Sequence, residues 1–276
     1  MVTLEPEPLL RLRALVRNRR TPPQVTSLPG GLVVRAKGRG LETADLRAFA
    51  YGDDPRHIDR NATARTGQPQ IRTFHAERDS TTLLVADFRP SMLWGTRRTL
   101  RSIAAAEALS VIGWQAIHTG GRVGLIAVTG GETVYQAAAG RDRGMVAVIG
   151  AMVQAHARAL GHAADPDPPL SDALARARRV APRGAQVALA TALDHPGEEF
   201  ADRVAALQRR TALSVIRIAD AFETEAPRGV FRYQTADGRA GAAPAHALAP
   251  EDPAGLITAT YRTHLAPDAQ EHQLHG

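Results

Sequence analysis

Short apolar runs alternate with longer helical segments from Thr82 onward, and this alternation constrains the fold more than any other feature of the chain. The runs have the length and composition of buried strands, and the segments between them are long enough to form crossover helices. Parallel strands joined by such crossovers build a sheet with helices on both faces. The sequence therefore predicts an α/β domain with a doubly wound, mostly parallel sheet.

The expected elements of this domain follow one another along the chain. Strands are predicted at 82–86, 122–128, 186–190 and 212–218, and residues 132–137 are expected to pair back on the second of these strands across a glycine turn. Helices are predicted at 97–119, 144–160, 171–180, 198–209 and 253–264, with a turn-rich hairpin at 230–240. Ser171 is expected to cap the third of these helices, because a serine hydroxyl accepts hydrogen bonds from the first turn.

The chain before this domain has a different character, so we divide it at 1–23, 24–80 and 81–276. Residues 9–20 read as a basic amphipathic helix with leucines on one face, and we expect that face to pack on the main body. A contact with a membrane surface or a partner is the alternative for this helix. Residues 24–80 are rich in glycine and arginine and are predicted to form a small β-rich lobe.

Composition excludes several classes of protein. The chain of 276 residues has no cysteine, which rules out disulfides, thiolate metal sites and cysteine catalysis. We find neither a secretory signal nor an apolar run long enough to cross a membrane, so we expect a cytoplasmic protein. The net charge is +6 and comes almost wholly from arginine, while aromatic residues make up only 4%, which leaves few platforms for base stacking. The signal for nucleic-acid binding is therefore weak.

Familiar catalytic patterns are missing from the sequence. It contains no glycine-rich dinucleotide motif, no phosphate-binding loop and no nucleophile elbow. Its ten histidines are scattered, without a pair spaced for zinc on a helix. No general base is paired with a nucleophile, so we do not expect an enzyme.

The phrase Asp87-Phe88-Arg89-Pro90-Ser91 directly follows the first predicted strand. Ligands of open α/β sheets bind at the carboxyl ends of strands, and Asp87 lies at such an end. The spacing of Asp87 and Ser91 is similar to the Asp-x-Ser-x-Ser motif of von Willebrand factor A-type domains, in which a carboxylate and two hydroxyls bind Mg²⁺ or Mn²⁺. Arg89 stands where that motif has its middle serine.

A second run, Gly52-Asp53-Asp54-Pro55-Arg56-His57-Ile58-Asp59, identifies the family that the chain resembles. It is similar to the signature of the bacterial family called domain of unknown function fifty-eight, typically encoded beside MoxR-type AAA+ ATPases. The tryptophan that usually follows in that family is Arg60 here. The residues that carry the family motif are Arg47, Gly52, Asp53, Asp54, Arg56, Asp59 and Arg65.

The resemblance implies a von Willebrand A-like domain preceded by a small β-rich segment. Members of the family are thought to act as adaptors or substrates of the neighbouring ATPase. The chain is therefore expected to be a non-enzymatic interaction module with a MoxR-type ATPase or another protein as its partner. The resemblance, with the exposed-anchor preference of tryptophan and arginine, gives these residues for the interaction site: Asp87, Arg89, Ser91, Trp94, Ser171 and Asp194.

Whether this site still holds a cation depends on Arg89. Ser171 can stand for the threonine of the second loop, but Ala192 follows the later strand where a carboxylate is expected, and Asp194 comes two residues late. A guanidinium repels a divalent ion and only donates hydrogen bonds. We therefore expect Arg89 to pair with Asp87 or Asp194 in place of the ion, so that no cofactor is needed. The alternatives are Mg²⁺ or Mn²⁺ on Asp87, Ser91 and Ser171, or a loop that does neither.

Two further hypotheses concern other charged residues. Asp53, Asp54 and Asp59 could hold a metal, but Pro55 and Arg56 interrupt them, so we favour a turn whose carboxylates pair with nearby arginines. The expected arginine partners are Arg47, Arg56 and Arg65. The alternative function is binding of an anionic polymer, nucleic acid or lipid headgroup, through Arg11, Arg13, Arg17, Arg19 and Arg20. Neither partner identity nor oligomeric state follows from the sequence.

Overall fold

A computed structural model describes residues 3–17, 45–49, 58–73, 80–225, 228–234, 239–244 and 255–270. The chain divides into two compact units, of which one contains the N-terminal helix and everything from Ser80 onward and the other spans Val34–Asp79.

The larger unit is built around a central sheet, which has six strands in the described residues, in the order β10-β7-β6-β3-β4-β5. Five of them run parallel, and β5 at one edge is antiparallel to β4. The expected mostly parallel α/β architecture is thereby confirmed. The strands are β3 (Thr81–Phe88), β4 (Arg122–Thr129), β5 (Val134–Gly140), β6 (Gln186–Thr191), β7 (Ala212–Ala219) and β10 (Ile257–Arg262).

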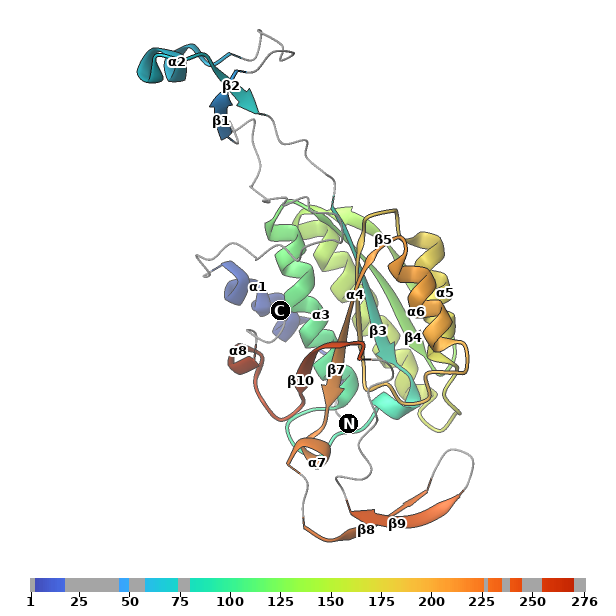
Figure 1. Cartoon of the computed structure of the whole chain (residues 1–276). Helices are drawn as coiled ribbons and strands as arrows, with labels where there is room; N and C mark the ends of the chain where they lie inside the picture. The colour runs from blue at the N-terminus through green and yellow to red at the C-terminus, as the bar shows by residue number, and fades with distance from the viewer. Residues whose placement is uncertain are drawn as a thin grey trace. The chain divides into compact units, whose positions relative to one another are not determined.

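Helices cover both faces of this sheet (Figure 1). Alternate residues of β3 point to opposite faces, so Leu84 and Ala86 join the core under α3 and α4, whereas Leu83 and Val85 join the core under α5 and α6. The helices are α1 (Pro6–Arg17), α3 (Arg101–His118), α4 (Arg141–Gly161), α5 (Leu170–Val180), α6 (Phe200–Gln208), α7 (Ala221–Thr224) and α8 (Pro267–Gln270), with a short 3-10 turn η2 (Pro90–Met92).

Helix α1 packs on α3 and α4 through its leucine face. Leu9 and Leu12 are buried, and the indole Nε1 of Trp114 donates a 3.0 Å hydrogen bond to the carbonyl oxygen of Leu9. The guanidinium of Arg13 lies 5.6 Å from the centre of the Trp114 ring and also pairs with Asp142. The apolar face of α1 is thus occupied within its own unit; residues 18–20 of the expected helix lie outside the described residues.

The prediction of a final helix at 253–264 is wrong. Residues Ile257–Arg262 form β10, which extends the sheet parallel to β7. The β-branched and aromatic residues of this segment favour a strand, and pairing with β7 buries Tyr261 completely. The Tyr261 hydroxyl donates to Glu107 of α3 at 3.2 Å, and Arg98 binds both oxygens of the same carboxylate. The Glu107 carboxylate thus links the edge strand β10 to α3.

Two details at helix starts also differ from expectation. Helix α3 begins at Arg101 rather than at residue 97, which leaves residues 93–100 as a loop. Ser171 does not cap α5, because the capping position is Pro169 and no side chain accepts a hydrogen bond there. The hairpin expected at 230–240 is present as β8 (Val230–Gln234) and β9 (Ala240–Pro244). In the described part of the chain, no helix is long and apolar enough to cross a membrane.

The smaller unit contains a two-stranded antiparallel sheet and a helix in its described residues. Strand β1 (Asp45–Ala48) pairs antiparallel with β2 (Gln70–Thr73), and α2 (Arg60–Thr66) lies between them in sequence. The sequence did not lead us to expect this helix. Its signals are nevertheless present: the Asp59 carboxylate accepts a 2.9 Å hydrogen bond from the Ala62 N–H, and Gly67 ends the helix with a φ of 71°.

A buried histidine gives the larger unit a predictable pH dependence. His156 of α4 is 1% exposed, shares a 2.9 Å hydrogen bond with the Ser102 hydroxyl and packs edge-on against Phe88. Burial lowers the pKa of His156 from 6.5 to about 4. Between pH 6.5 and pH 4, His156 therefore binds a proton in the unfolded chain but not in the folded chain. The free energy of unfolding falls as the pH drops through this range.

We expect His156 to lower the free energy of unfolding by about 2 kcal/mol when the pH falls from 7.5 to 5. Urea unfolding of His156→Gln over the same pH range should show a drop smaller by that amount, although the variant is less stable at neutral pH. His162→Gln is the control for replacing a histidine at the surface, where His162 pairs with Asp165. Equal slopes in wild type and His156→Gln would contradict the assignment.

Candidate functional site

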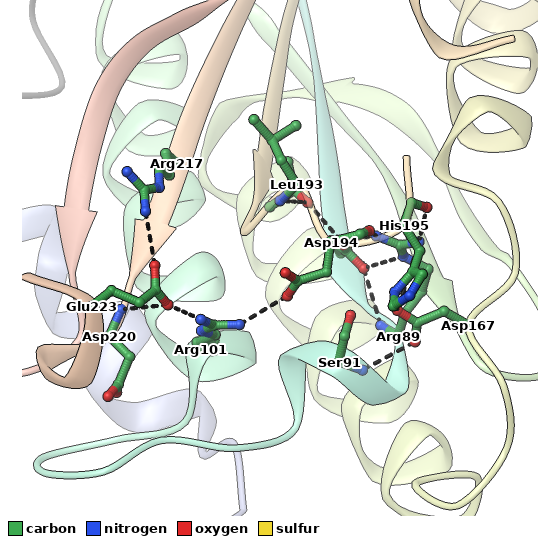
Figure 2. A network of polar contacts seen from close by, with 12 residues as sticks. Arg89, Ser91, Arg101, Asp167, Leu193, Asp194, His195, Arg217, Asp220 and Glu223 are labelled. Carbon is green, nitrogen blue, oxygen red and sulfur yellow. Dashed lines mark hydrogen bonds and ion pairs between the residues drawn. The ribbon is translucent and has the colours of Figure 1, made fainter. Parts of the chain in front are cut away.

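Polar side chains collect where β3, β6 and β7 end, at the carboxyl edge of the sheet (Figure 2). Asp87 is the penultimate residue of β3, and Asp220 directly follows β7. Asp194 lies in the loop that follows β6. Parallel strands bring their carboxyl ends to one edge, which is why residues more than a hundred positions apart meet here.

Arg89 uses all of its side-chain donors inside the protein. Its Nε and Nη2 bind the two carboxylate oxygens of Asp87, each at 2.9 Å. Its Nη1 donates to the carbonyl oxygens of Pro168 at 2.9 Å and His195 at 3.0 Å. The second hydrogen on Nη2 goes to the carbonyl oxygen of Asp194 at 2.7 Å. A guanidinium has five N–H donors, so none is left for a ligand.

The carboxylate of Asp87 is equally saturated. Besides the two guanidinium contacts, Oδ1 accepts the backbone N–H of Arg89 at 3.1 Å, and Oδ2 accepts the hydroxyl of Thr191 at 2.7 Å. Both Asp87 and Arg89 are 0% exposed. Burial alone would lower the pKa of Arg89, but the ion pair with Asp87 outweighs it and raises that pKa above its ordinary value. Arg89 is therefore a permanent cation, and of the two expected carboxylate partners it takes Asp87.

The loop from Thr191 to Gly197 has a strained backbone that Arg89 holds in place. Leu193 and His195 have φ angles of 66° and 45°, a region that side-chain-bearing residues rarely adopt. Such a residue costs on the order of 1–3 kcal/mol unless its surroundings fix it. The carbonyls of Asp194 and His195 both point at Arg89, and the N–H of Leu193 donates to Thr191 Oγ1 at 3.0 Å.

A second buried arginine extends this network towards β7. Arg101, the first residue of α3, is 4% exposed and bridges the carboxylates of Asp194 at 2.8 Å and Glu223. Glu223 in turn pairs with Arg217 at 2.9 Å. Burial lowers the pKa of Arg101 and raises that of Asp194, although their mutual attraction opposes both shifts. The carboxylate of Asp194 thus pairs with Arg101, whereas its backbone carbonyl accepts a hydrogen bond from Arg89.

Trp94 covers Arg101. The guanidinium lies 4.0 Å from the centre of the indole ring, which is the geometry of a cation–π contact. A side chain at residue 95 would overlap the carbonyl oxygen of Thr99, so Gly95 lets the loop fold back and place Trp94 there. Trp94 is 37% exposed and Met92 is completely buried, so of these two residues it is the tryptophan that offers a surface to solvent.

Asp220 fixes the β7 end of the site. Its carboxylate accepts hydrogen bonds from the N–H and hydroxyl of Thr96, from the N–H of Phe222 and from the hydroxyl of Thr263 at 2.8 Å. Burial would raise the pKa of Asp220, but these hydrogen bonds outweigh it and lower the pKa. The loop that carries Trp94 is thereby tied to β7 and to the end of β10.

The two serines of the expected site do not join the Asp87 carboxylate. Ser91 donates its backbone N–H to Asp167 at 3.0 Å, and its hydroxyl is buried without a hydrogen-bond partner in the described residues. Ser171 is buried against Gly197, and its N–H donates to the carbonyl oxygen of Pro196 at 3.1 Å.

The donor set does not fit a divalent cation. Mg²⁺ and Mn²⁺ need several free oxygen ligands, but the oxygens of Asp87 already accept four hydrogen bonds, and a guanidinium lies where positive charge is needed. The described residues also contain no group of three His, Cys, Asp or Glu side chains arranged to hold a metal. Asp87, Ser91 and Ser171 thus lack the arrangement that the metal alternative requires.

The family motif is described only in part. Asp59 caps α2, and Arg65 donates from Nε to the carbonyl oxygen of Asn61 at 3.3 Å. Both contacts are within the smaller unit and belong to α2. The side chain of Arg47 and the motif residues Gly52, Asp53, Asp54 and Arg56 lie outside the described residues, so their expected pairing stays a prediction.

Several members of the network were missed from the sequence. Thr191 and Arg101 contact Asp87 and Asp194 directly, and Asp167 lies 3.9 Å from Arg89 Nη1. Thr191 could have been noticed as a hydroxyl residue at the end of a buried strand. The backbone carbonyls of Pro168 and His195 carry no sequence signal.

Comparison with known proteins identifies the family of this chain. The family model described as protein of unknown function DUF58 matches residues 45–241, so the chain belongs to that family. Uncharacterized proteins of Mycobacterium bovis and Mycobacterium tuberculosis are 33% identical to it over 127 residues. The match covers 45% of this chain and 40% of each relative, so it spans about two fifths of the relatives' length.

Proposed function

We propose that the chain is a non-enzymatic protein-interaction module that binds its partner at the carboxyl edge of the sheet. The observation that carries this proposal is the saturation of the buried Asp87–Arg89 pair, which fixes three loops without offering a reactive or metal-binding group. A rigid set of loops is what a recognition surface needs. Asp87 and Arg89 then act by ordering the loops, since neither has any exposed surface.

The resemblance of the Asp87–Ser91 loop and of the family motif supplies the finer parts of the proposal. They are a von Willebrand A-like domain with a degenerate metal-ion-dependent adhesion site and a MoxR-type AAA+ ATPase as partner. The cytoplasmic location expected from the sequence is part of the same proposal. The parallel sheet with one antiparallel edge strand is compatible with that type of domain. The loss of the metal ligands supports recognition without an ion.

Trp94 is the residue on which we expect partner binding to depend most. Its ring rests on Arg101 on one side and is exposed on the other, so it is held rigidly before a partner arrives. Tryptophan is the residue type most enriched among interface hot spots, and a preorganised side chain loses little entropy on binding. Arg97, in the same loop, forms an exposed ion pair with Glu225, and this pair would lie in the polar rim of the interface.

Trp94→Ala should weaken binding to a MoxR-type ATPase of the same organism by about 10- to 100-fold, measured by biolayer interferometry. Tyr135→Ala is the matched control, because Tyr135 is an aromatic residue of similar exposure on the edge strand β5. Its affinity should stay at the wild-type value. The proposal fails if both variants bind as wild type does, or if wild type binds no such ATPase at all.

The alternative of anionic-polymer binding through α1 receives no support from the contacts of that helix. Arg11 pairs with Glu7 at 3.1 Å, Arg13 pairs with Asp142 at 2.6 Å, and the leucine face is buried on α3. Arg17 is exposed, and Arg19 and Arg20 lie outside the described residues.

A further inference from the structure

A different group of arginines gathers at the opposite, amino edge of the sheet. Helices α5 and α6 pack side by side on one face of the sheet (Figure 1). Short loops join their carboxyl ends to the starts of β6 and β7. A 2.8 Å hydrogen bond from the Gly184 N–H to the Arg210 carbonyl oxygen joins the two helix ends. We name this surface the arginine corner; it consists of Arg176, Arg178, Arg179, Arg183, Arg209 and Arg210.

The six arginines of the arginine corner have no acidic ion-pair partner among the described residues. Residues 173–186 and 203–213 contain no aspartate or glutamate. By contrast, most arginines of the carboxyl edge are paired. Arg178, Arg179, Arg183 and Arg209 are exposed, and Arg210 has a buried Nε without a hydrogen-bond partner. Helix dipoles favour basic residues in last turns but do not require the neighbourhood to lack acids.

We propose that the arginine corner binds the phosphate backbone of duplex nucleic acid without sequence preference. Guanidinium forks match phosphate oxygens, and backbone contacts need charge and donors but no shaped pocket. The large apolar residues that the described structure exposes are Trp94, Tyr135, Val146, Val230 and Tyr233, and none belongs to the corner. A protein-binding surface typically has an apolar centre, and a helix bound to a lipid surface inserts apolar side chains. A single-stranded nucleic acid is bound by aromatic side chains on which its bases stack.

The test is fluorescence anisotropy of a labelled 20-base-pair DNA duplex titrated with the full chain at 50 to 200 mM salt. With about four phosphates contacted, the affinity should fall about 100-fold across this range. Arg178→Gln/Arg179→Gln should bind about tenfold more weakly at 50 mM and reduce the slope of log affinity against log salt by about 2. Glutamine keeps the helix propensity of arginine, so the fold should be retained.

The matched control is Arg228→Gln/Arg232→Gln, which removes the same charge from exposed positions at the β8–β9 hairpin. It should bind as wild type does. The proposal is overturned if wild type does not bind the duplex at 50 mM salt, or if the two double variants lose affinity equally. Equal or tighter binding of a single strand, a polyglutamate peptide or anionic lipid vesicles overturns the assignment to duplex backbone. Since the corner and Trp94 are at opposite edges, these outcomes leave the partner-binding proposal untouched.

Discussion

Arg89→Ala is expected to lower the free energy of unfolding by about 3–5 kcal/mol, the cost of leaving one member of a buried ion pair without its partner. The change removes five side-chain hydrogen bonds at once. The buried Asp87 carboxylate then keeps two donors, the backbone N–H of residue 89 and the hydroxyl of Thr191. It also removes the hydrogen bonds from Arg89 to the carbonyl oxygens of Asp194 and His195, which hold the loop with its strained residues Leu193 and His195 in place. Urea unfolding followed by circular dichroism measures the loss.

Two further variants separate this explanation from a general sensitivity of the loop. Arg97→Ala removes an arginine from the following loop that makes an exposed ion pair with Glu225, and it should cost less than about 1 kcal/mol. Asp87→Leu/Arg89→Met removes both charges and should be less damaging than Arg89→Ala alone. If Arg89→Ala is no more harmful than Arg97→Ala, the guanidinium does not organise the site.

Arg101→Ala should have the next largest effect, a loss of about 2–4 kcal/mol. The variant leaves Asp194 and Glu223 without their shared cation, although Arg217 still pairs with Glu223 and part of Asp194 reaches solvent. Trp94 also loses the guanidinium beneath its ring. We therefore expect weaker partner binding together with lower stability, because the tryptophan is no longer held in place.

Arg13→Ala is the control for Arg101, because Arg13 makes the same two types of contact near the surface. It stacks on Trp114 and pairs with Asp142, but its side chain is 45% exposed. Such a pair is screened by water and should contribute no more than about 1 kcal/mol. Similar losses of stability in the two variants, measured in the same urea titration, would show that burial of the Arg101 network does not set its contribution.

The sequence predicted the parts of the fold that depend on local patterns. The α/β class, the strands from β3 to β7 and the hairpin of β8 with β9 follow from apolar runs and turn residues. Strand β10 was mistaken for a helix because its short segment has no clear period, and its identity is decided by pairing with β7. Helix α2 was missed although Asp59 and Gly67 mark its ends, because only seven residues separate the two caps.

The sequence predicted which residues gather at the candidate site better than it predicted their contacts: Asp194 was one of two carboxylates expected to pair with Arg89, but it offers Arg89 its backbone carbonyl while its carboxylate pairs with Arg101. Asp87 and Arg89 are two positions apart on the end of a strand, so their pairing could be expected from charge alone. Thr191 and Asp194 are brought to Asp87 and Arg89 by the parallel pairing of β3 with β6, whose register no local pattern reveals. The saturation of Arg89 depends on three backbone carbonyls, which every residue type carries.

The central claim is that Arg89, and not a divalent cation, neutralises Asp87. Isothermal titration calorimetry of the full chain with Mg²⁺ and with Mn²⁺ tests it most directly, with Asp87→Ala as the comparison. Because every acceptor site of the carboxylate is filled, we predict no saturable heat for the wild-type chain with either ion. Micromolar binding to the wild type that disappears in Asp87→Ala would contradict the account.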